Sequence, residues 1–110
     1  MAAVNSAIVG NVVAAVNEQP IATFESAIRA MHGAGSRLIS RERVDERFGG
    51  DPVWQGEVLV FELLDHPTAT RCYAWEVDGE VTAVLGEPPV DSAAAAVRAS
   101  IMADEKPAQA

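Results

Sequence analysis

The sequence predicts an α+β fold of the order αα-ββββ-α, in which a four-stranded antiparallel meander packs against helices. Three observations predict it. Apolar residues recur at helical spacing before residue 33, and they alternate with polar residues after residue 36. An Asp-Gly pair at residues 78–79 then marks a tight hairpin. The 110 residues fit one domain, 1–110, with residues 104–110 expected to form a flexible tail.

Two helices are expected in the first third of the chain. The first covers about residues 4–16, where several valines lie near one helical side. The second begins at Pro20, because proline suits the first turn of a helix, and it runs to about His32. Its apolar stripe consists of Phe24, Ala27, Ile28 and Met31. Gly33 or Gly35 supplies the left-handed residue that ends this helix.

Four strands and a last helix follow. As a strand, residues 37–48 place Leu38, Val44 and Phe48 on one side and the four arginines on the other. Val44 and Phe48 are also four apart, so a helix fits this segment as well. The stretches "VWQGEVLVFELL", "TRCYAWEV" and "EVTAVLG" are rich in β-branched and aromatic residues and are expected as strands. The "EPP" sequence ends the sheet, because proline cannot donate to a strand ladder. A final helix follows, capped by Asp91 or Ser92.

The turns between the strands set a trial register. It places Phe48 opposite Val53, Leu64 opposite Ala69, and Val77 opposite Glu80. One face then collects Leu38, Val44, Phe48, Val53, Leu59, Phe61, Leu63, Cys72, Ala74, Val81, Ala83 and Leu85. Its central residues are small, so we expect the helices to pack on this face.

The opposite face of the sheet is also apolar and carries three of the six aromatic residues. It collects Ile39, Trp54, Val58, Val60, Tyr73, Trp75, Val77 and Val84, with Glu62 opposite Arg71. A large apolar face in water usually marks an interface or a ligand groove. One interpretation is a homodimer that pairs these faces, with the Glu62–Arg71 pair fixing the orientation. The other is that one helix covers the face as ordinary core.

A second group of candidate site residues is acidic. The trial register places Glu57 and Glu76 in one row with Val44 and Val81, flanked by Glu42 and Glu46. Neighbouring carboxylates raise one another's pKa and suit cation binding or general-base chemistry. A sheet curved around its helices would place them at the mouth of a pocket, as in small cone-shaped folds of the nuclear-transport-factor type. In the other interpretation they lie in solvent beyond the helices.

Other site types are excluded by composition and spacing. The single Cys72 allows neither an internal disulfide nor a cysteine-based zinc site, and the register separates it from His66. The net charge of −8 opposes binding to nucleic acid. The N-terminal apolar run lacks a positive start and is too short and polar to span a membrane. We expect a cytoplasmic protein with no metal, cofactor, nucleic-acid or membrane partner.

Residues 48–101 carry several short sequence features: "VW-G", "VF-L", "HP-A", "CYAW" and "PPV-S---AVR". In these features the chain resembles a group of small uncharacterised bacterial proteins, some of them carried on mobile integron gene cassettes. The resemblance covers about half of the chain. It implies a bacterial cytosolic protein that forms oligomers, and it assigns no activity and no catalytic residue.

The leading hypothesis is therefore a non-enzymatic protein that homodimerises and binds a protein partner or small ligand. Its anchors would be Trp54, Tyr73 and Trp75. The alternative is a small pocket enzyme, or a binder of cationic ligands, that uses the four glutamates. A third hypothesis is an antitoxin-like accessory protein whose acidic surface masks a basic partner.

Overall fold

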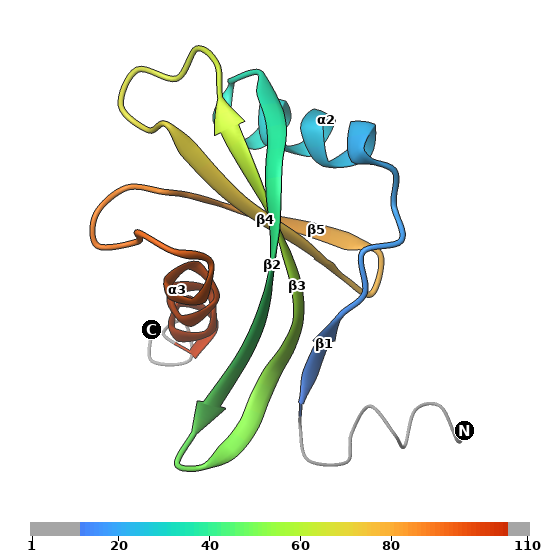
Figure 1. The fold of residues 1–110 in the computed structure, drawn as a ribbon, viewed down its shortest axis with the longest axis vertical. Helices are drawn as coiled ribbons and strands as arrows, with labels where there is room; N and C mark the ends of the chain where they lie inside the picture. The colour runs from blue at the N-terminus through green and yellow to red at the C-terminus, as the bar shows by residue number, and fades with distance from the viewer. Residues whose placement is uncertain (1–11, 106–110) are drawn as a thin grey trace.

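A computed structural model describes residues 12–105 as a mixed five-stranded sheet with one helix on each face (Figure 1). The elements are β1 (Val13–Ala15), α2 (Ile21–His32), β2 (Ser36–Phe48), β3 (Asp51–Leu63), β4 (Arg71–Val77), β5 (Glu80–Leu85) and α3 (Ala93–Glu105). The α+β class is as predicted. The four-stranded antiparallel meander is corrected to a mixed sheet, because β1 pairs with β3 in parallel.

The centre of the sheet is β3, which has three neighbouring strands. Along one edge it pairs with β2 over nearly its whole length. Its other edge is shared, since β1 pairs with residues 54–56 and β4 pairs with residues 59–62. The seven-residue β4 is shorter than the thirteen-residue β3 and leaves room for β1 beside it.

The strand β1 corrects the first predicted helix. Residues 13–15 are extended, residues 12 and 16 are not helical, and residues 4–11 of that prediction lie outside the described residues. Gly56 explains how β1 comes so close, because a Cβ atom there would lie 2.6 Å from the Cβ of Ala15. The β-branched valines of this segment suit a strand as well as they suit the apolar side of a helix.

The register is as predicted at two of the three turns. Val77 lies opposite Glu80, and Leu59 opposite Ala74 continues the predicted Leu64–Ala69 alignment. Residues 37–48 form a strand, but their predicted pairing with β3 is wrong.

The turn at Gly49 and Gly50 and a bulge between Glu46 and Arg47 together account for the error. Both glycines have positive φ, so they form a two-residue turn that sets Phe48 opposite Asp51. A β-bulge between Glu46 and Arg47 then shifts the register by one residue, so Val44 lies opposite Gly56 instead of Glu57 and belongs to the other face.

Each face of the sheet is covered by one helix (Figure 1). The α2-side core contains Phe24, Ile28, Ala34, Leu59, Phe61, Leu63, Ala69, Cys72 and Ala74. The α3-side core contains Ala15, Val44, Trp54, Val58, Val60, Tyr73, Trp75, Ala93, Ala96 and Val97. The expectation that all helices share the first face is therefore wrong for α3.

Local signals determine where both helices begin or end. The backbone of Pro20 is extended just before α2, and Gly33 is left-handed at its end, with its N–H donating to Arg29 O at 2.8 Å. At α3, the hydroxyl of Ser92 accepts from Ala95 N at 3.1 Å and satisfies one free amide of the first turn. In residues 12–105 neither helix is long and apolar enough to cross a membrane.

Candidate functional site

The predicted aromatic anchors lie in the α3-side core. Trp54 and Trp75 are each 2% exposed and pack edge to face, with ring centroids 5.5 Å apart. Tyr73 is 5% exposed, and the nearby Val58 and Val60 are fully buried. The alternative in which one helix covers this face is the one observed. These side chains do not present a free surface to a second copy of the chain.

The predicted pair of Glu62 and Arg71 is aligned but is not an ion pair. The two residues lie opposite each other on β3 and β4, as the register predicted. The carboxylate of Glu62 instead binds the guanidinium of Arg37 on β2. Within the described part of the chain, Arg71 has no acidic group within ion-pairing distance.

The four predicted pocket acids do not form a cluster. Glu57 and Glu76 lie on the α2 face of the sheet, whereas Glu42 and Glu46 lie on the α3 face. The β-bulge between Glu46 and Arg47 separates them, because a displacement of one residue reverses the face to which a side chain points. Glu57 pairs with Arg41 at 3.5 Å, and Glu46 with Arg98 at 3.3 Å. No group of three or more metal-ligating side chains occurs in residues 12–105.

Glu76 is buried and has a structural role in joining β1 to the rest of the sheet. Its carboxylate accepts hydrogen bonds from the backbone amides of Glu18 at 2.8 Å and Gln19 at 3.1 Å. The amide side chain of Asn17 donates to Glu57 O at 2.6 Å and accepts from Glu76 N at 2.8 Å. We call this group, Asn17 and Glu76 with their backbone partners, the Asn17–Glu76 clamp. It satisfies backbone groups where β1 and β4 diverge along β3.

Two further candidate groups, His66 and Cys72, are engaged elsewhere. His66 Nδ1 accepts from the amides of Thr68 and Ala69 at 3.2 and 3.0 Å, which fixes the β3–β4 loop. Cys72 is fully buried in the α2-side core, and burial raises the pKa of its thiol to about 12. A thiol with that pKa is a poor nucleophile at neutral pH.

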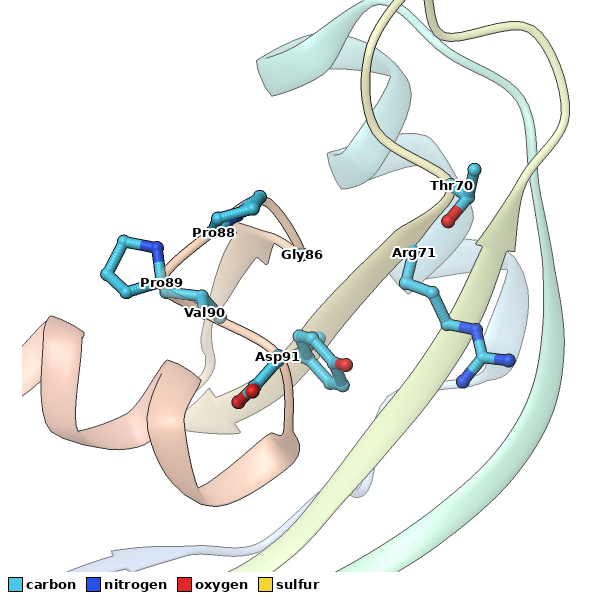
Figure 2. Close-up of a pocket in the computed structure, with 8 residues that line it drawn as sticks. Thr70, Arg71, Gly86, Pro88, Pro89, Val90 and Asp91 are labelled. Atoms are coloured by element: carbon cyan, nitrogen blue, oxygen red, sulfur yellow. The ribbon is translucent and has the colours of Figure 1, made fainter.

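A hollow of about 400 Å³ lies between the start of β4 and the segment that joins β5 to α3 (Figure 2). Thr70, Arg71 and Tyr73 form one wall. Gly86 and residues 88–91 form the other. The prolines at 88 and 89 have no N–H to donate to a strand, so the chain leaves the sheet here and then enters α3.

Gly86 is the point at which the two walls of the hollow meet. Its N–H donates to Arg71 O at 2.7 Å, which makes it the last residue held to β4. A Cβ atom at this position would lie 3.1 Å from both Tyr73 Cε2 and Arg71 Cβ. The absence of a side chain therefore lets the loop and β4 meet closely at the base of the hollow.

The hollow contains a phenol and two opposite charges. Burial raises the pKa of Tyr73; Arg71 lowers it in part, and Glu42 and Asp91 raise it further. The phenol is thus neutral at physiological pH and forms no hydrogen bond with other described residues. Asp91, like Arg71, forms no ion pair in the described part of the chain. This arrangement provides polar groups that are free to bind a ligand.

The sequence predicted two residues of this site but not the hollow that they line. Arg71 and Tyr73 were expected at an interface or a ligand groove on the sheet face, and they line a hollow beside residues 86–91. Thr70, Gly86 and residues 88–91 were not predicted as site residues. The "GEPPVD" sequence indicated that the chain leaves the sheet, but not that it passes back over β4. Comparisons with known protein families, curated proteins and solved structures found no match.

Proposed function

We propose that this protein is a non-enzymatic module that binds a small molecule carrying an anionic group in the hollow between β4 and residues 86–91. The observation that carries the proposal is the guanidinium of Arg71. Arg71 lines this hollow, and its guanidinium, which extends away from residues 86–91, has no acidic partner within residues 12–105 (Figure 2). A planar guanidinium binds carboxylates and phosphates through paired hydrogen bonds.

The other walls support binding of a small ligand. The neutral Tyr73 phenol offers a donor and an acceptor beside Arg71, and Thr70 adds a hydroxyl. Pro88, Pro89 and Val90 provide apolar surface opposite them. A volume of about 400 Å³ is at the low end of known ligand sites, which fits a ligand of few atoms.

This proposal keeps the ligand-binding part of the sequence hypothesis and moves it to another surface. Two of the three aromatic residues that were expected to anchor a dimer, Trp54 and Trp75, are covered by α3, and the third, Tyr73, lines the hollow. The glutamate alternative has less support, because its four carboxylates lie on two faces and three of them already bind protein groups.

The test uses pentanoate as a probe, followed by two-dimensional ¹H–¹⁵N NMR. We expect saturable shifts of the Gly86 amide and the Arg71 side-chain Nε–H. Arg71→Gln should weaken binding about tenfold or more, since a hydrogen bond to a charged group contributes roughly 1.5–3 kcal/mol. Tyr73→Phe should weaken it less, because this change removes only the hydroxyl.

Arg43→Gln is the matched control. Arg43 is exposed on β2, does not line the hollow and, like Arg71, forms no ion pair among the described residues. The variant's affinity for pentanoate should equal that of the original protein. Equal weakening by both arginine substitutions would show general charge attraction and would contradict the proposal. So would the absence of any saturable shift at Gly86.

A further inference from the structure

We infer that the ligand of this hollow is a zwitterion whose ammonium and carboxylate groups are separated by a short methylene chain. The inference rests on the proposed function and specifies its ligand class. In this arrangement the ligand carboxylate binds Arg71, its ammonium binds Asp91, and its methylene groups lie against Pro88, Pro89 and Val90.

The first argument is the pair of opposite charges in one hollow. Arg71 and Asp91 both line it, and they are not ion-paired with each other or with other described residues. Figure 2 shows Arg71 on β4 and Asp91 on the loop before α3, with their charged ends pointing apart. A ligand that satisfies both groups must therefore carry opposite charges at a distance from each other.

The second argument is the charge of the whole protein. The net charge is −8, so a simple anion is repelled at long range as it approaches. A zwitterion has no net charge and avoids this repulsion. Its ammonium group also compensates Asp91, whose carboxylate would otherwise oppose an anion bound nearby.

The third argument is the chemistry of the wall on which Asp91 lies. Proline side chains and Val90 offer no hydrogen-bond donors, and proline also lacks the backbone N–H. Such a wall suits a methylene chain better than a polar one. The pKa of Tyr73 is raised, so its phenol stays neutral and adds no third charge.

The test compares four probes by the same NMR titration: 5-aminopentanoate, its isomer L-norvaline, pentanoate and pentylamine. We expect 5-aminopentanoate to bind about tenfold more tightly than pentanoate, as one added charge-assisted contact predicts. L-norvaline has the same composition but adjacent charges and should bind no better than pentanoate. Asp91→Asn should remove the advantage of 5-aminopentanoate and leave or strengthen pentanoate binding.

Asp51→Asn is the matched control, because Asp51 is an exposed aspartate at the start of β3 and does not line the hollow. It should preserve the order of the four affinities. If pentanoate and 5-aminopentanoate bind equally, and Asp91→Asn changes neither, the zwitterion inference is wrong while the proposed anion site stands. If L-norvaline binds as tightly as 5-aminopentanoate, the charge separation is wrong. If no probe binds, both proposals fail.

Discussion

The pKa of the Cys72 thiol shows how strongly burial within the sheet affects a single titratable group. It is fully buried between β3 and β5, paired with Phe61 on one side and Leu85 on the other. Burial disfavours the charged thiolate and raises the pKa from 9.0 to about 12. The unfolded chain holds the same thiol in water, where its pKa is ordinary. The two states therefore differ in bound protons at alkaline pH.

This difference predicts an alkaline loss of stability. Between pH 9.0 and about 12 the folded state keeps the Cys72 proton and the unfolded state releases it, so the free energy of unfolding falls as pH rises. The fall from this group approaches about 1.4 kcal/mol per pH unit at most. It should be absent in Cys72→Ala, and the two proteins should show a constant stability difference below pH 9. Urea unfolding at a series of pH values measures this, and parallel curves above pH 9 would contradict it.

At the scale of elements, the Asn17–Glu76 clamp joins β1 to the sheet. The strand β1 has only three residues and three paired positions on β3, too few to hold it strongly. The side chains of Asn17 and Glu76 extend this attachment with four hydrogen bonds to backbone groups. They also fix the entry into α2, because Gln19 lies just before Pro20. The buried carboxylate thus organises a junction of three elements.

Glu76→Ala should therefore destabilise the protein by about 1–3 kcal/mol, the usual effect of leaving buried polar groups without a partner. Amide hydrogen exchange should become faster at residues 13–19 before it changes in β4 and β5. Glu80→Ala is the control, since Glu80 is exposed on β5, and should stay within roughly 0.5 kcal/mol of the original protein. Faster amide exchange that is confined to β4 and β5, with β1 unaffected, would contradict the role given to the Asn17–Glu76 clamp.

The ends of elements were predictable where the residue type indicates the backbone conformation, because proline fixes φ and glycine readily adopts positive φ. Pro20 and Gly33 bounded α2 correctly, and Asp78 and Gly79, both with positive φ, fixed the β4–β5 hairpin. Prediction failed where the sequence allowed two solutions. "GGDP" fits a two-residue turn as well as a four-residue loop, and the valines before residue 17 fit a strand as well as a helix. The hollow was missed because it depends on tertiary placement of the loop at residues 86–91.

At the scale of the whole molecule, the structure is a helix–sheet–helix arrangement with an exposed outer strand, β2. In the described chain β2 pairs only with β3, so its other edge is free of strand partners. Between its two bulges, at Leu38/Ser40 and at Glu46/Arg47, the arginines of β2 are Arg41 and Arg43, both at odd positions. In a two-fold dimer that pairs β2 with itself, residue i opposite residue j requires j opposite i in the same type of pair. Hydrogen-bonded and non-hydrogen-bonded pairs alternate along an antiparallel ladder, so i and j must be an even number of residues apart, and odd residues face odd ones. Registers centred on residues 41–43 therefore oppose two arginines, which disfavours a dimer paired there.

The homodimer predicted from the aromatic face is disfavoured for a different reason, since that face already packs against α3. We expect a monomer of 11.6 kDa whose mass in sedimentation experiments does not change with concentration. Trp75→Ser should lower the free energy of unfolding by about 3–5 kcal/mol, the range for truncating a buried aromatic residue, without changing that mass.

Phe48→Ser is the control for this last prediction, because Phe48 is 80% exposed at the β2–β3 turn and contributes little to the core. It should alter stability by no more than roughly 0.5 kcal/mol. A dimer that dissociates on Trp75→Ser while each chain stays folded would mean that α3 moves away from the aromatic face and that a second copy packs there. A dimer that dissociates on Phe48→Ser instead would place the contact at the hairpin tip. In either case the molecule would use a surface that its charge pattern and core packing do not favour.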